Sequence, residues 1–217
     1  MIRLDEVVRD MNAIVKDVAA GALPRDYGIF AITSLRFAVE LVAHLEDGGF
    51  HNPAWVRSLA LDADTRYLNA VRNVSGARPP PWQLAFDVAD RGEHKAVRNL
   101  LLGINAHIMY DLVVTLAPVL DPSRRDEQHR DFMRINDIIE RAVDGVQDQI
   151  EANTPPWLLE ADVVSGRIDE LLVWTLFKVT RAGAFDQAEK LRDGRITRRQ
   201  VEKRAMQIGR ALVHLPI

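Results

Sequence analysis

The segment from Glu93 to Leu116 constrains the fold of this chain most, because its residues are apolar on almost every side of the helix that they predict. A helix that is apolar all round is buried. Other helices must therefore enclose it, and a chain of 217 residues is long enough to supply them within one domain. We expect a buried central helix with the rest of the chain packed around it.

Apolar residues recur at helical intervals of three and four along the rest of the chain as well. No stretch shows the alternation of period two that predicts a strand. The predicted fold is therefore all-α, a single-domain bundle of about seven to eight helices. The domain covers residues 1–217, with its core at about 25–190 and with two terminal helices, 2–20 and 197–215, packed on that core.

Turn-forming residues separate the predicted helices. Asn52 and Pro53 suit the cap and the first position of one helix, and Asp121 suits the cap of another. The run Pro79-Pro80-Pro81 predicts a stiff connector between two helices. Further helices are predicted at residues 27–45, 82–89 and 166–191.

The composition excludes several classes of protein. The net charge of −3 argues against a nucleic-acid binder, which normally carries a basic face. Without cysteine, the chain has no disulfide scaffold, no thiol catalysis and no Cys-ligated metal site. The first residues are unlike a signal peptide, and no uncharged apolar stretch reaches the roughly 18 residues of a membrane span. We expect a cytoplasmic protein with no membrane span and no nucleic-acid partner.

Three polar residues, Asn105, His107 and Asp111, interrupt the apolar central segment. A buried polar group without a partner costs about 1–3 kcal/mol, so each of them needs a reason to be there. His107 and Asp111 are four residues apart and face the same side of an α-helix, and Tyr110 borders that side. The carboxylate could fix the tautomer of the imidazole and raise its basicity, which suits a general base.

The His107–Asp111 pair has two other interpretations. It could hold a metal ion through a nitrogen and an oxygen, with Asp131 as a further ligand, or it could only satisfy the hydrogen bonds of a packed core. Gly103, in the middle of the same helix, costs about 1 kcal/mol relative to alanine and is favoured where a helix or a ligand approaches closely. No cofactor is expected, and a divalent metal is kept as an alternative.

The central residues resemble the signature of an uncharacterised bacterial family, catalogued as a domain of unknown function. The resemblance is carried by Leu100–Ile108, which contains Gly-Ile-Asn-Ala-His-Ile, and by Asp111-Leu112. It extends over about residues 25–190, through a second block at Asp131–Asn136 and weaker echoes at Arg66-Tyr67 and Arg181-Ala182. It implies a helical single domain and brings no established reaction.

Two positions depart from the pattern of that family. The chain has Asn99 where the family pattern has a histidine, and Phe185 where it has a tryptophan. The first departure weakens a metal site built from several histidines.

Four residues outside the central helix are further candidates for substrate binding, and each also has a structural interpretation. Asp131 and Asn136 could meet the polar residues of the central helix; otherwise Asp131 interacts with a helix dipole and Asn136 satisfies a core hydrogen bond. Tyr67 could bring its hydroxyl to a pocket or be a core aromatic residue. Arg181 could bind a carboxylate or phosphate, or pair with Asp131 or Asp111.

These residues support three functional hypotheses. The first is an enzyme that holds a small, largely apolar organic molecule between helices and transfers a proton with His107 and Asp111. Cyclisation, isomerisation, dehydration and hydrolysis all fit, as in bacterial secondary metabolism. The residues available to bind its substrate are Asn105, Tyr67, Tyr110, Asp131, Asn136 and Arg181.

The second hypothesis is a metal-dependent hydrolase with His107, Asp111 and Asp131 as ligands. The third is a non-catalytic helical binding module whose polar core only fixes packing. The expected partner is a small-molecule ligand. Monomer and homodimer both remain open, because the apolar stripe of the C-terminal helix can pack in cis or dimerise.

Overall fold

A computed structural model of the chain describes residues 4–74, 76–92, 96–153 and 167–215. The α-helices are α1 (Leu4–Ala19), α2 (Tyr27–Glu46), α3 (Pro53–Arg72), α4 (Pro80–Arg91), α5 (Ala96–Ala106), α6 (Val113–Leu116), α7 (Arg125–Asn153), α9 (Arg167–Arg192) and α10 (Arg198–Val213). A π-helical turn, His107–Leu112, joins α5 to α6, and two 3-10 turns, Ala117–Val119 and Pro122–Arg124, lead on to α7. The described ranges contain no strand, which confirms the predicted all-α fold.

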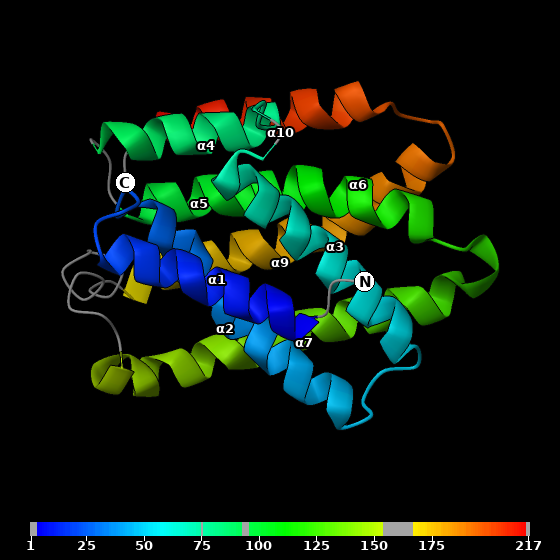
Figure 1. Cartoon of the computed structure of the whole chain (residues 1–217). Coiled ribbons are helices and arrows are strands. Elements are labelled where there is room, and N and C mark those ends of the chain that lie inside the picture. Colours follow the sequence, from blue (N-terminus) through cyan, green and yellow to red (C-terminus); the bar gives the residue numbers. More distant parts are fainter. Residues whose placement is uncertain (1–3, 75, 93–95, 154–166, 216–217) are drawn as a thin grey trace.

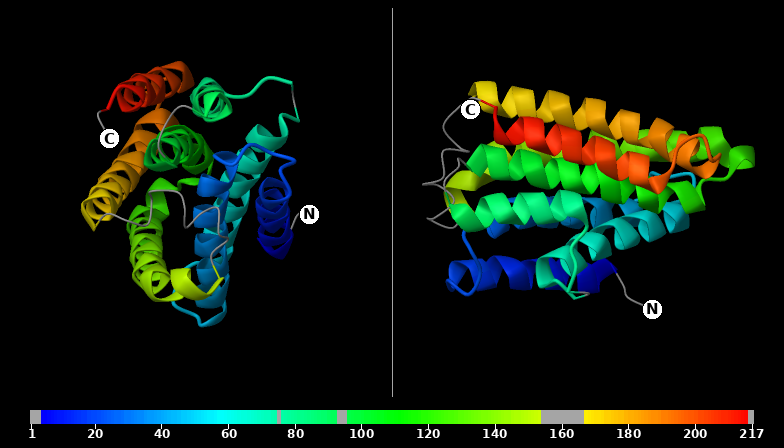
Figure 2. Two further views of the ribbon diagram at one scale, coloured as in Figure 1. Left: turned by 90° about the vertical axis from the view of Figure 1, so that its left-hand side faces the viewer. Right: turned by 90° about the horizontal axis from the view of Figure 1, so that it is seen from above.

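The central helix, formed by α5, the π turn and α6 (residues 96–116), is enclosed by α2, α3, α4, α9 and α10 (Figure 1). Seen from the end of the bundle, it lies inside the surrounding helices (Figure 2, left). Every residue from Val97 to Ala117 is buried except His107, which keeps part of its surface accessible. The predicted burial of this segment is therefore confirmed, and the exception falls on a candidate site residue.

The first and last helices pack on opposite sides of this arrangement (Figure 1). Helix α1 lies on α2 and α3, and α10 lies on α4 and α5. Each buries one stripe of residues three or four apart, which is the pattern that made both helices predictable. The stripes are Leu4, Val7, Met11, Ile14 and Val18 in α1, and Val201, Ala205, Gly209 and Leu212 in α10. The hydrophobic core that they join runs continuously from Leu4 to Leu212.

The helix ends follow the capping residues closely. Asn52 accepts a hydrogen bond from the backbone N–H of Trp55 at 3.1 Å, with Pro53 at the first helical position. Asp121 accepts from the backbone N–H of Ser123 at 2.9 Å, at the start of the 3-10 turn before α7. The run Pro79–Pro81 is not only a connector, because its last two prolines form the first turn of α4. Proline is tolerated there, since the first helical N–H groups have no partner within the helix.

Within the described ranges, two helices are long and apolar enough to cross a membrane, judged by length and hydropathy alone. They are Tyr27–Glu46, with a mean hydropathy of 1.5 over its best window, and Val97–Val119, with 1.6. The core helix of a soluble protein passes the same test, and Val97–Val119 is enclosed by its neighbours. The expectation of a cytoplasmic protein with no membrane span stays a prediction.

Helices α2 and α5 approach each other closely at Gly103. A Cβ atom on Gly103 would lie 2.7 Å from Cδ2 and 2.9 Å from Cγ of Phe30. The phenyl ring is itself packed against other rings, so it cannot move aside without cost. This contact explains a glycine in the middle of an enclosed helix.

We expect Gly103→Ala to lower the free energy of unfolding by about 1–2 kcal/mol, because the overlap with Phe30 outweighs the better helix propensity of alanine. Gly183→Ala in α9 is the matched control, since its Cβ would meet no atom within 4 Å. That variant should be about 0.5–1 kcal/mol more stable than the wild type. Urea denaturation of both variants measures the difference, and an equal gain in the two would contradict the close approach.

Candidate functional site

His107 and Asp111 do not form the predicted pair. The helix changes its geometry between these two residues. In the π turn His107–Leu112 the backbone bonds join residues five apart, so residues four apart no longer stack as in an α-helix. Asp111 Oδ2 instead accepts a hydrogen bond from Trp82 Nε1 of α4 at 2.6 Å. Nδ1 of His107 is buried and has no hydrogen-bond partner among the described residues.

Asp111 is held mainly by Trp82. Burial raises the pKa of Asp111 to about 7, against the opposing effects of the indole hydrogen bond and of Arg66. A carboxyl group in this environment is partly protonated near neutral pH. The interaction ties α4 to the central helix, and it takes Asp111 away from the role of orienting His107.

A different set of side chains surrounds His107. We call Asp64 of α3, His107 and Arg181 of α9 the buried cluster. The charge of Arg181 acts on both of the other groups: it lowers the pKa of His107 and opposes the rise in the pKa of Asp64. Asp64 and Arg181 are each only 4% exposed. The cluster therefore brings three ionisable groups from three helices into the interior of the bundle.

Burial moves each member of the buried cluster towards its neutral form. It raises the pKa of Asp64 to about 7, lowers that of His107 to about 3, and lowers that of Arg181 to about 9. Near neutral pH, His107 is a neutral imidazole, Arg181 keeps its charge, and Asp64 is divided between carboxyl and carboxylate. Oδ2 of Asp64 has no hydrogen-bond partner in the described part of the chain.

Two predicted residues support this cluster. Asn136 accepts a hydrogen bond through Oδ1 from Arg181 Nε at 2.7 Å, and the guanidinium lies 4.8 Å from the ring centroid of Phe132. Tyr67 is one turn after Asp64 on α3, and its hydroxyl is buried with no partner among the described side chains. Burial and the nearby Asp64 raise the pKa of Tyr67, so its phenol stays protonated.

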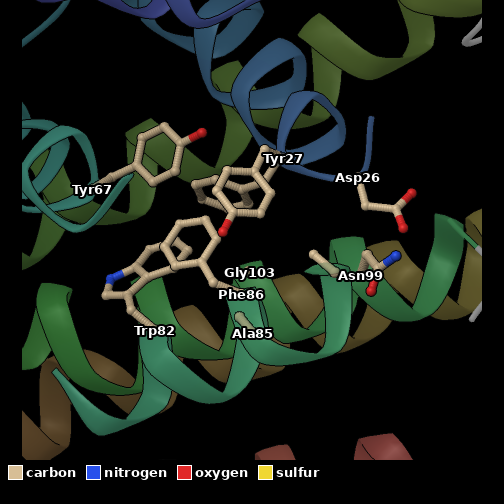
Figure 3. Close-up of a pocket in the computed structure, with 10 residues that line it drawn as sticks. Asp26, Tyr27, Tyr67, Trp82, Ala85, Phe86, Asn99 and Gly103 are labelled. Atoms are coloured by element: carbon tan, nitrogen blue, oxygen red, sulfur yellow. The ribbon is translucent and has the colours of Figure 1, made fainter. Parts of the chain in front are cut away.

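Next to the cluster lies a small pocket with aromatic walls (Figure 3). Its volume is about 20 Å³, room for about one water molecule. Five of its ten lining residues are aromatic: Tyr27, Phe30, Tyr67, Trp82 and Phe86. Asp26, which is partly exposed, lies with Asn99 at one end, and Tyr67 and Trp82 lie at the other, buried end (Figure 3).

The ring of Phe30 separates this pocket from His107. Its centroid lies 4.8 Å from that of Tyr67 and 5.3 Å from that of Trp82, both of which line the pocket. On another side it lies 5.6 Å from the imidazole of His107. His107 itself does not line the pocket. Phe30 therefore contacts both the rings of the pocket and the imidazole of the buried cluster.

Asn105 and Tyr110 face α10 and lie away from the cluster. Asn105 donates through Nδ2 to the backbone carbonyl of Ala205 at 3.0 Å. The hydroxyl of Tyr110 accepts from Nε and Nη2 of Arg198 at 3.0 and 2.8 Å. Both residues therefore have a structural role, because their bonds hold α10 against the central helix.

Asp131 lies on α7 and is buried against the turn that precedes α3. Its two carboxylate oxygens accept hydrogen bonds from the backbone N–H groups of His51 and Asn52, each at 2.8 Å, and Nδ1 of His51 lies 3.1 Å from Oδ1. This carboxylate thus links α7 to the start of α3. The sequence left open a contact between Asp131 and the polar residues of the central helix. Asp131 bonds to His51 and Asn52 instead.

The metal-dependent alternative has no geometric support in the part of the chain that the structure describes. Among these residues, no group of three or more His, Asp or Glu side chains is arranged to hold a metal ion. The three ligands suggested by the sequence have separate surroundings: His107 in the buried cluster, Asp111 at Trp82, and Asp131 at His51.

Asp64 is absent from the candidates predicted above, although the sequence contains a signal for it. Asp64 lies on the buried stripe of α3, four residues after Ala60, three before Tyr67 and four before Leu68. A carboxylate at such a position is as unusual as His107 in the central helix. The role of Trp82 had no comparable signal, because the π turn that directs Asp111 towards it leaves no mark in the apolar pattern.

The family of the chain follows from a comparison with family models. A model described as a family of unknown function (DUF5995) matches residues 4–215. The chain belongs to this family. The predicted membership of an uncharacterised family is thereby confirmed, whereas the exact signature and the bacterial origin stay predictions. No curated protein and no solved structure matched the chain in the other two comparisons.

We expect the buried position of Asp64 to make stability depend on pH. Its pKa is about 7 in the native protein and near 3.8 in the unfolded chain, so between these values the native state binds more protons. The contribution of Asp64 to stability is then largest below about pH 4 and is lost as the pH rises to about 7. Asp64→Asn removes this loss, and its free energy of unfolding relative to the wild type should rise by up to about 4 kcal/mol between about pH 4 and pH 8.

Urea denaturation of both proteins at a series of pH values measures this difference. Asp62→Asn is the control, because Asp62 is on the same helix with 54% of its side chain exposed. A difference between Asp64→Asn and the wild type that stays flat with pH, as for the control, would contradict the environment described for Asp64.

Proposed function

We propose that the chain is an enzyme that binds a small, largely apolar organic molecule between its helices and transfers a proton to or from it. The observation that carries this proposal is the buried cluster beside an aromatic pocket. Ionisable groups with strongly displaced pKa values in an apolar interior are typical of catalytic sites. The reaction class remains cyclisation, isomerisation, dehydration or hydrolysis, each of which needs a proton moved.

The geometry favours Asp64 as the group that exchanges the proton. A pKa near the working pH makes a group effective both as acid and as base, and that of Asp64 is about 7. Oδ2 has no hydrogen-bond partner within the described residues, so it is available to a substrate. In the sequence hypothesis this role belonged to His107 with Asp111 behind it; the bond from Trp82 to Asp111 supports the reassignment.

His107 and Arg181 then stabilise charge on the substrate. With its pKa lowered to about 3, His107 stays neutral and can accept a hydrogen bond at Nδ1 from a hydroxyl or N–H group. The guanidinium of Arg181, positioned by Asn136, supplies the positive charge that favours a developing oxyanion. Environments that push the pKa values of neighbouring groups apart give them distinct acid and base roles.

The substrate reaches the cluster through the aromatic pocket. In the structure the ring of Phe30 lies between the pocket and His107. A molecule larger than water must displace that ring, since the pocket holds only about 20 Å³. Once the ring has turned, the molecule is surrounded by aromatic side chains and shielded from water, which strengthens its interaction with the cluster.

A non-catalytic binding module is the second candidate function. The bonds of Asn105 to Ala205 and of Tyr110 to Arg198 favour it, because they show that polar residues of the central helix can serve packing alone. It predicts that ligand binding survives the loss of Asp64 and that no turnover occurs.

A metabolite screen in D2O distinguishes the two candidates. The wild-type protein is incubated with a small-molecule extract, and mass spectrometry follows compounds that change in amount or take up deuterium. We expect such a compound with the wild type, and a loss of about 10²–10⁴ in rate with Asp64→Asn, the usual contribution of a general acid or base. His107→Phe, which keeps a ring next to Phe30, should also slow the reaction.

Asp62→Asn again serves as the control and should react at the wild-type rate. A profile of rate against pH with an inflection near 7 in the wild type, absent in Asp64→Asn, would tie the effect to this carboxyl group. Wild-type turnover by Asp64→Asn would overturn the assignment of the proton transfer.

A further inference from the structure

Two residues that line the aromatic pocket each carry a polar group with no hydrogen-bond partner in the described part of the chain. These groups are the side-chain amide of Asn99, at both Nδ2 and Oδ1, and the hydroxyl of Tyr67. Asn99 is only 6% exposed and Tyr67 only 1%. Buried polar groups are nearly always paired, and an exception calls for an explanation. The pocket as it stands has room for about one water molecule, and polar groups at its wall are available to a larger ligand when the pocket opens.

Other polar groups of the pocket are already engaged. The indole N–H of Trp82 donates to Asp111, and the phenol of Tyr27 lies beside Asp90 and Arg78, which act on its pKa in opposite directions. Asn99 and Tyr67 therefore remain for a ligand, and they lie at opposite ends of the pocket (Figure 3). The walls between them are aromatic rings, with Trp82 and Phe86 stacked at 5.6 Å and Tyr27 4.5 Å from Phe86.

We propose that this pocket binds a small, neutral molecule with a flat unsaturated ring and a group that donates and accepts hydrogen bonds side by side, such as a carboxamide or a lactam, and that Asn99 recognises that group. A primary amide both donates and accepts, so its natural complement is a second amide-like group. Flat aromatic walls favour a flat ring.

The electrostatics of the pocket favour a neutral ligand. The lining residues include no lysine, arginine or histidine, and the carboxylate of Asp26 lies at the same end as Asn99 (Figure 3). A carboxylate ligand would be repelled there and would lose its hydration. Arg78, whose guanidinium lies 4.4 Å from the ring centroid of Phe86, is already bonded to the backbone carbonyls of Ala70 and Val71. The amide of Asn99 carries no net charge that could compensate.

The inference rests on the proposed function in one respect, namely that this ligand is the substrate. Its amide group at Asn99 would then direct the far edge of the ring towards Tyr67. Tyr67 lies one helical turn from Asp64, so that edge is the part of the molecule nearest the proton-transferring carboxyl. The ring can enter only when Phe30 moves away from Gly103, the glycine that its side chain contacts.

Binding of benzamide to the full-length protein tests the proposal. The indole N–H resonance of Trp82 is followed by NMR, with that of Trp55, which is bonded to the carbonyl of Val119, as an internal reference. We expect benzamide to shift the Trp82 signal with a dissociation constant on the order of 1 mM, which is normal for so small a ligand. Benzoate, with the same ring and a negative charge, should bind at least about 10-fold more weakly.

Asn99→Leu has the same branched shape without the amide. It should bind benzamide about 10-fold more weakly than the wild type and bind toluene equally well. Asn69→Leu, at an exposed position of α3, is the matched control and should change neither affinity. Phe30→Ala should bind both benzamide and toluene more tightly, because it enlarges the pocket.

The melting temperature without ligand gives a second readout. Asn99→Leu removes an unsatisfied buried amide and should raise Tm by about 2–4 °C. A fall in Tm would show that Asn99 serves the fold, and it would overturn the proposal. Binding of benzamide by Asn99→Leu as tight as by the wild type, or no shift at Trp82 in any variant, would also overturn it.

Turnover and benzamide binding are measured separately, so that failure of the catalytic assignment can be distinguished from failure of the binding site. His107→Phe leaves the pocket residues unchanged and should still bind benzamide. If that variant and Asp64→Asn keep full turnover while benzamide binding depends on Asn99, the assignment of catalysis fails and the binding site stands. If benzamide binding is independent of Asn99 and turnover depends on Asp64, the binding site fails and the assignment of catalysis stands.

Discussion

The central helix is enclosed on all sides, and the polar groups that it carries depend on neighbouring helices for their partners. Asn105 bonds to the backbone of α10, and Asp111 bonds to Trp82 of α4. Tyr110 receives two bonds from Arg198. Asn105 and Tyr110 thus connect the buried helix to α10, and Asp111 connects it to α4, so the polar residues specify how these helices are arranged. His107 and Asn99 depart from this arrangement, since Nδ1 of His107 and the amide of Asn99 have no such partner among the described residues.

Burial inside the bundle also determines the charge states of the ionisable side chains in the interior. Burial moves Asp64, Asp111, His107 and Arg181 towards their neutral forms, and this effect is larger than the influence of any neighbouring charge on them. The interior therefore holds carboxyl groups that exchange protons near neutral pH, beside an imidazole that does not. Acid–base chemistry on an apolar molecule needs this combination, and a core built only for packing would gain more from apolar residues of similar volume.

The apolar pattern predicted the fold well because burial of a stripe depends on spacing alone. Helix α2 was predicted at 27–45 and runs to Glu46, and the caps at Asn52 and Asp121 lie where their side chains indicated. Pro80 and Pro81 were assigned to a connector, because proline suits both a connector and the first turn of a helix.

The site was less predictable, for two physical reasons. In the π turn the backbone hydrogen bonds join residues five apart instead of four. The apolar residues of this segment stay buried, but the side chain of Asp111 bonds to Trp82 and not to His107. The partners of Asp131 come from a turn 79 and 80 residues away in the chain, and no local pattern encodes such a contact. Asp64, by contrast, could have been identified, because it interrupts the apolar stripe of its own helix.

Burial sets the charge states of Asp64 and His107 in this structure. An NMR titration of the Asp64 carboxyl and the His107 ring in the folded protein measures both charge states. We expect the carboxyl to titrate near 7 and the imidazole to stay neutral as the pH is lowered to about 4. A carboxyl that titrates near 3.8 together with an imidazole that titrates near 6.5 would contradict this expectation, because both groups would then behave as they do in water.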